Sequence, residues 1–253
     1  MINLKTTQEM KNNAKKTILS ILSSAALLSA SAFASSTDMP SQQKENSIEL
    51  AFVTHLDLGM AEQDVYVELE KGSNEVYRVT AGFHNMDAPL YTSAEYIAHD
   101  PFNPENIGPY KKGKAMGMTV GQWLKHTGKG TYTYTDGEGK LMLKFTGLVP
   151  NGTYTIWHAF LPATPPVPFT GTLDLPLGAS DGSESVFTAD ANGNMEVEHT
   201  FKPGLEFSDV WTMAVLALNY HSDGKTYGGH PGSFGDKTHL QAVAILPARE
   251  GIN

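Results

Sequence analysis

The chain has 253 residues, no cysteine and a net charge of −9. Without cysteine it can form neither a disulfide nor a thiolate metal site, so a bound metal would need histidine, methionine or carboxylate ligands. The negative charge, with no dense basic patch to offset it, excludes nucleic acid and an anionic membrane surface as partners.

Residues 1–34 have the pattern of a secretory signal peptide. Four lysines precede an apolar run from Ile18 to Leu28, and the small-residue motif Ala32-Phe33-Ala34 follows. The run is too short to cross an apolar bilayer core of about 30 Å. We therefore predict cleavage after Ala34 and a periplasmic or secreted protein without stable membrane insertion. Cleavage removes four lysines and one glutamate, which leaves a charge of −12.

The rest of the chain predicts one β-rich domain. Residues 35–46 are polar and indicate a flexible leader, and residues 47–249 are long enough to bury a core without disulfides. Apolar runs and alternating patterns between Gly, Asn and Pro turns predict strands at 48–56, 64–70, 75–80, 131–135, 140–145, 153–161, 186–189, 195–201, 210–220 and 239–246. Such strands predict an all-β fold, an antiparallel β-sandwich of the Greek-key or jelly-roll type.

Two segments do not follow the strand pattern. Residues 84–116 contain four prolines and no hydrophobic period, so we expect a long ordered loop over the sheet. Residues 119–126 predict one short helix, because Thr119 and Gln122 have the spacing of a capping box.

Histidine is the residue type that indicates chemistry. His158 lies on the predicted strand 153–161, His221 ends the strand 210–220, and His239 begins the last strand. If these last two strands are antiparallel neighbours, His221 and His239 meet at one end of the sheet, and His158 can complete the set. Three imidazoles with an open fourth position suit zinc or copper. We therefore predict a metal site formed by His158, His221 and His239, for metal handling or a metal-dependent reaction.

Other functions stay open at this point. A histidine at a strand end is more often a structural residue, and a spacing this wide is less specific than a compact motif. The alternative is a non-catalytic module that binds a glycan, a small molecule or a protein. A metal-free hydrolase using Asp223 or Asp236 has the least support, because neither paired carboxylates nor a GxSxG motif stands out.

Two weaker patterns also involve metal ligands. Met116 and Met118, with His84 and Met86, resemble a soft copper surface, although methionine more often fills gaps in a core. The stretch 190–194 begins with the oxygen spacing of a calcium loop but lacks the closing glutamate, so a hairpin turn is expected there.

Two motifs resemble those of known families. The segments GLVPNGTYTIWH at 147–158 and HSDGKTYG at 221–228 resemble a family of secreted bacterial and archaeal proteins. That resemblance implies that His158, His221 and His239 recur together, without His230. A looser similarity is to copper–zinc superoxide dismutase and the chordin-type sandwich. This chain has one histidine where the dismutase has a His-x-His pair, and it lacks the disulfide, so that likeness implies a sandwich and not dismutase activity.

Overall fold

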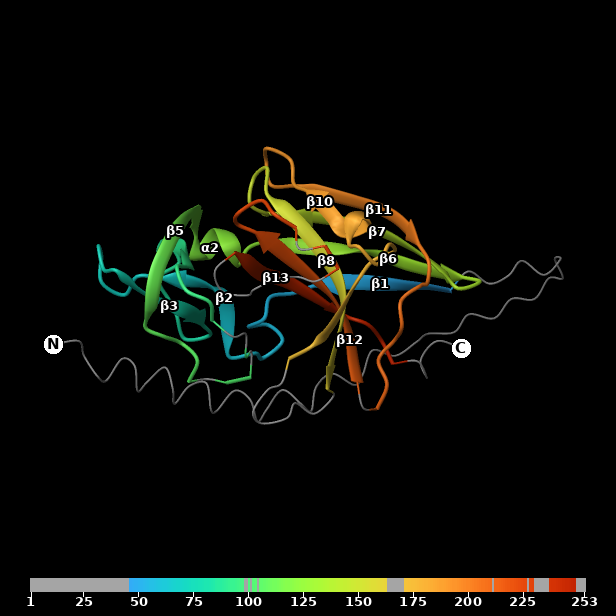
Figure 1. Cartoon of the computed structure of the whole chain (residues 1–253), viewed down its shortest axis with the longest axis horizontal. Coiled ribbons are helices and arrows are strands. Elements are labelled where there is room, and N and C mark those ends of the chain that lie inside the picture. The colour runs from blue at the N-terminus through green and yellow to red at the C-terminus, as the bar shows by residue number, and fades with distance from the viewer. Residues whose placement is uncertain are drawn as a thin grey trace, which may run out of the picture.

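The computed structural model describes residues 46–97, 100, 102, 103, 105–162, 171–210, 212–226, 228, 229 and 237–248. The predicted signal peptide and all but the last residue of the predicted leader lie outside these ranges. The described chain is built mostly of antiparallel strands with one short α-helix, which confirms the predicted all-β class. Two sheets form a sandwich, and a small barrel lies at one side of it (Figure 1).

Four strands form the first sheet, sheet A, in the order β1-β6-β7-β11. Their bounds are Asn46–Phe52 for β1, Thr127–Thr135 for β6, Glu138–Thr146 for β7 and Met195–Phe201 for β11. All neighbours are antiparallel. β6 and β7 form the hairpin that the turn residues Asp136 and Gly137 predict, because both adopt positive φ.

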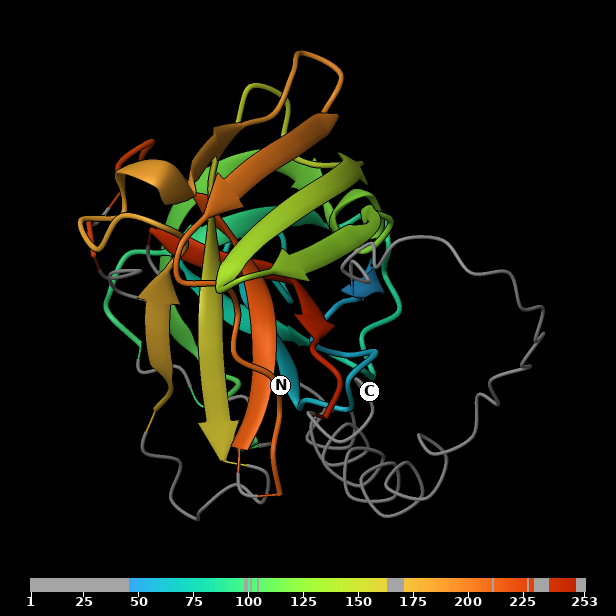
Figure 2. The same cartoon turned by 90° about the vertical axis from the view of Figure 1, so that its right-hand side faces the viewer.

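Five strands form the second sheet, sheet B. The order is β10-β8-β12-β13, and β9 also pairs with β8. The bounds are Thr153–Pro162 for β8, Leu173–Pro176 for β9, Val186–Thr188 for β10, Thr212–His221 for β12 and Thr238–Ile245 for β13. β12 and β13 are antiparallel neighbours, as the sequence predicts. Figure 2 shows β8, in yellow, between β9 and the orange β12.

Sheet B is buried on both faces. Its inner face packs on sheet A in a core that includes Leu141, Leu143, Phe145, Ile156, Leu216 and Leu218. Its outer face carries a second cluster, here called the outer cluster, formed by Met60, Trp157, Ala159, Leu161, Val215, Ala217, Leu240 and Val243. Burial on both faces explains why β8 and β12 have nearly continuous apolar runs instead of alternation.

The barrel corrects the prediction of a long ordered loop at 84–116, because two of its strands arise from this segment. It consists of β2 (Glu62–Val67), β3 (Glu75–Thr80), β5 (Tyr110–Thr119) and β4 (Pro89–Ser93) in closed order. The predicted hairpin of β2 and β3 is confirmed, with Val67 opposite Tyr77. β4 and β5, however, arise from the segment that showed no period. Every barrel residue lies between β1 and β6, which pair in sheet A.

Two local predictions have different outcomes. The helix forms as α2, Val120–Trp123, and the capping box of Thr119 and Gln122 is present, but the helix ends well before Gly128. The turn at 190–194 exists without being a hairpin tip, because β10 pairs with β8 while β11 pairs with β7. The turn therefore carries the chain from sheet B to sheet A.

Candidate functional site

His158 lies on the inner face of sheet B. It is opposite Leu216, a residue of the inner core, and its ring contacts Phe160 with centroids 4.4 Å apart. Its Nε2 donates a hydrogen bond to the Glu206 carbonyl at 3.0 Å. Burial lowers the pKa of His158 below its usual value, so the ring is neutral at neutral pH. These contacts describe a satisfied structural histidine.

His221 lies on the other face of the same sheet. Its Nε2 is 2.8 Å from the Thr155 hydroxyl, which also accepts a hydrogen bond from the Trp157 indole at 2.6 Å. Trp157 belongs to the outer cluster, and side chains two residues apart on a strand share a face. Burial lowers the pKa of His221 to about 4.

The register separates the three predicted ligands. His221 is opposite Thr153, and His158 lies five residues further along β8, which is about 16 Å at 3.3 Å per residue. His239 is opposite Tyr220 and adjoins His221 in the register, as predicted. The structure thus brings His221 and His239 to the same end of sheet B, with His239 beside Tyr220 on the inner face. It places His158 further along that inner face, opposite in side to His221.

No metal-binding arrangement of three or more histidine, aspartate or glutamate side chains is found within the described ranges. A copper or zinc site at His158, His221 and His239 therefore stays a prediction that this geometry does not favour. In the weaker copper pattern, Met116 is buried in the inner core while His84 is exposed. The Asp190 carboxylate accepts hydrogen bonds from Asn192 and Asn194, which indicates a turn rather than a calcium loop.

A pocket opens on the outer face of sheet B. Its cavity volume is about 40 Å³, and the segment that leads from β1 to β2 covers it with His55 and Met60. The walls come from β8, β9, β12 and β13. They are mostly apolar and include Ala159, Leu161, Val215, Ala217, Leu240 and Val243. A mostly apolar lining with a few polar groups is typical of small-molecule sites, but this cavity is far smaller than the usual volume of about 300–1,000 Å³.

Asn219 is the polar group that this pocket leaves unsatisfied. It lies on β12, only 2% exposed, and lines the pocket. Its Oδ1 has no hydrogen-bond partner among the described residues. A buried acceptor without a partner costs about 1–3 kcal/mol, so a fold keeps one only where something compensates.

Two titratable groups share the pocket with Asn219. His55 is fully buried and donates from Nδ1 to the Glu62 carbonyl at 3.2 Å, and burial lowers its pKa to about 4. Asp174, on β9, accepts a hydrogen bond from the Thr172 hydroxyl at 2.8 Å, and burial raises its pKa. At neutral pH the polar part of the wall thus consists of a neutral imidazole, an amide and a carboxyl group whose ionisation is disfavoured.

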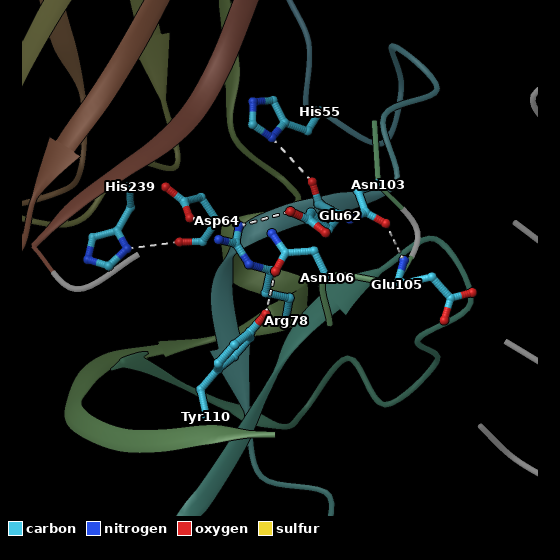
Figure 3. Close-up of polar contacts among 9 residues, drawn as sticks. All are labelled: His55, Glu62, Asp64, Arg78, Asn103, Glu105, Asn106, Tyr110 and His239. Carbon is cyan, nitrogen blue, oxygen red and sulfur yellow. Dashed lines mark hydrogen bonds and ion pairs between the residues drawn. The ribbon is translucent and has the colours of Figure 1, made fainter. Parts of the chain in front are cut away.

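A buried ionic cluster lies beside the pocket, inside the barrel (Figure 3). Arg78 Nη1 is 3.1 Å from both Glu62 Oε1 and Asp64 Oδ1, and all three side chains are fully buried. Burial raises the pKa of Glu62 to about 9, although Arg78 lowers it. At neutral pH Glu62 is therefore protonated, and the cluster consists of one ion pair, Asp64 with Arg78, beside a neutral acid.

Three residues of this region, Asn219, His55 and Glu62, were not predicted as site residues from the sequence. The signal that could have found Asn219 is its position as a polar residue in the apolar run 210–220. The burial of Glu62 and Asp64 at the start of β2 depends on a barrel that the sequence did not predict.

Neither a family model nor a curated protein matches this chain. The likeness to secreted proteins with the two quoted motifs therefore stays a prediction. Among the described residues, no helix is long and apolar enough to span a membrane.

Proposed function

We propose that this chain is a binding module for a small organic molecule, which Asn219 holds in the pocket on the outer face of sheet B, here called the outer pocket. The observation that supports this proposal is the buried Asn219 Oδ1, without a hydrogen-bond partner among the described residues, in a mostly apolar wall. A ligand with an apolar body and one N–H or O–H donor would satisfy this acceptor. The cavity of about 40 Å³ favours a molecule of a few heavy atoms over a glycan chain.

A pair of isosteric probes tests this proposal. Propionamide and butanone differ only in an amino group replaced by a methyl group, so only propionamide can donate to Asn219. We expect propionamide to shift the backbone amide resonances of Ala217, Asn219 and Leu240 in NMR titrations. Because one hydrogen bond to a buried acceptor is worth about 1.4 kcal/mol, butanone should bind about tenfold more weakly.

The variant Asn219→Leu distinguishes a binding role from a structural one. Replacing an unsatisfied buried amide with a leucine of similar size should raise the melting temperature and abolish the preference for propionamide. Asn192→Ala, at an exposed turn, is the control and should change neither property. Loss of stability in Asn219→Leu, or unchanged resonances around the pocket with both probes, would show that the amide is structural.

We further propose that this module acts outside the cytoplasm. The support is the pattern of residues 1–34: a lysine-rich start, a short apolar run and the Ala32-Phe33-Ala34 motif. Mass spectrometry of the protein from a periplasmic extract should find an N-terminus at Ser35 or within two residues of it. An intact chain beginning at Met1 in the cytoplasmic fraction would contradict export.

A further inference from the structure

A chain of hydrogen bonds joins a serine, a histidine and a backbone carbonyl where β12 ends. His239 Nδ1 lies 2.8 Å from the Asp64 carbonyl oxygen, as Figure 3 shows. On the other side of the ring, His239 Nε2 lies 3.0 Å from the Ser222 hydroxyl. Both distances are in the range of 2.6–3.2 Å that is typical of a nucleophile, its base and the group that orients the base.

The carbonyl determines which nitrogen of His239 carries the proton. A backbone carbonyl only accepts hydrogen bonds, so Nδ1 must be the N–H donor. In the neutral ring, Nε2 then has the lone pair and faces Ser222. This is the tautomer in which a histidine can remove a proton from a serine hydroxyl.

Packing holds the base in place while the serine stays accessible. His239 is completely buried, and its ring stacks on Tyr220 with centroids 5.9 Å apart and an interplanar angle of 29°. Ser222 is the first residue after β12 and is partly exposed. Its single hydroxyl proton has two acceptors in reach: the Lys237 carbonyl oxygen at 3.2 Å and the His239 Nε2 lone pair, which is nearer at 3.0 Å.

We propose that Ser222 is an activated nucleophile for acyl transfer from small carboxylic esters, with His239 as its general base. Ser222 Oγ forms a bond to the ester carbonyl carbon while His239 Nε2 takes the hydroxyl proton. The carbonyl–oxygen bond to the alcohol breaks, and the alcohol leaves with that proton. Water then hydrolyses the acyl-serine by the same route. This site is separate from the outer pocket and does not depend on the ligand proposed there.

Covalent labelling tests the nucleophile directly. A fluorophosphonate reacts with a serine only when its oxygen is activated; the oxygen displaces fluoride, and the hydroxyl proton leaves with it. We expect peptide mass spectrometry of the native protein to find the label on Ser222. We also expect stoichiometric release of p-nitrophenol from p-nitrophenyl acetate, followed by slower turnover.

Matched variants separate activation from mere exposure. Ser222→Ala should lose the label and the burst, whereas Ser73→Ala, at a partly exposed serine of the β2–β3 turn, should keep both. His239→Gln should slow labelling about 100-fold or more, in line with the loss of a general base. If His239→Gln does not fold, labelling of the native protein still tests the proposal. An unlabelled Ser222, or one labelled no faster than Ser73, overturns it.

Discussion

At the scale of single residues, the barrel buries a carboxylic acid that stays protonated at neutral pH. Glu62 has no exposed side-chain surface and shares Arg78 with Asp64. One guanidinium can balance only one of the two carboxylates, and a second buried negative charge would cost several kcal/mol. Keeping the proton on Glu62 avoids that cost, and it makes the stability of the barrel depend on pH.

Glu62→Gln should remove this dependence. The pKa of Glu62 rises from 4.5 to about 9 on folding, so its contribution to stability is complete below pH 4.5 and is lost as pH rises towards 9. The loss amounts to at most about 1.4 kcal/mol per pH unit. We expect Glu62→Gln to be more stable than the parent at pH 8–9 and to lose less stability between pH 5 and 9 in urea unfolding. Equal pH slopes in both proteins would contradict this assignment.

At the scale of elements, the β6–β7 hairpin depends on glycine for close backbone contact. A Cβ added to Gly130 would lie 1.9 Å from the Met142 carbonyl oxygen, and a Cβ added to Gly128 would lie 2.4 Å from the Phe145 ring. The Met142 oxygen belongs to the paired backbone of β7, so it cannot move aside as the end of a flexible side chain can. The pairing of β6 with β7, and with it the centre of sheet A, therefore requires glycine at position 130.

Gly130→Ala should accordingly destabilise the protein by about 2–4 kcal/mol, as expected when a backbone contact must shift. Lys129→Ala is the neighbouring control on the same strand; its side chain is exposed and its loss should change stability by less than about 0.5 kcal/mol. Chemical denaturation followed by circular dichroism measures both. Similar stabilities of the two variants would show that β6 can move away from β7.

Strands are also the elements that the sequence predicted best. β11 was predicted with its observed bounds, and β8 and β12 within two residues, because their apolar runs are long and bounded by turns. β4 and β5 were missed because their burial follows no period of two; β5 has lysines and glycines on a partly exposed strand. For the three histidines, the pairing of β12 with β13 could be inferred from the sequence, but the register of β8 against β12, which sets the distance from His158 to His221, could not.

At the scale of the whole molecule, buried histidines oppose Glu62 in their response to pH. Burial lowers the pKa of His55 and His221 from 6.5 to about 4, and it lowers those of His126 and His158 as well. A histidine whose pKa is lowered on folding contributes stability at pH values above its unfolded pKa of 6.5. This contribution is lost as pH falls towards 4. Acid therefore destabilises the protein through its histidines and alkali through Glu62.

We expect the melting temperature to peak near pH 6.5. As pH rises from 4.5 to 6.5, the stability gained from the four histidines exceeds the stability lost from Glu62. Above pH 6.5 the histidines add no more, while the loss from Glu62 continues. Differential scanning calorimetry from pH 4 to pH 9 measures this profile. A melting temperature that still rises from pH 7 to pH 9 would contradict it.

The insertion of the barrel between β1 and β6 has a consequence for the order of folding. β1 ends at Phe52 and its partner begins at Thr127, so the two strands can pair only after residues 53–126 have emerged and been arranged. Closing so long a loop costs entropy before any contact repays it, and contacts of large sequence separation slow folding. Such a chain stays open for longer before the sandwich can close, and an unfolded chain is what the export proposed above would require.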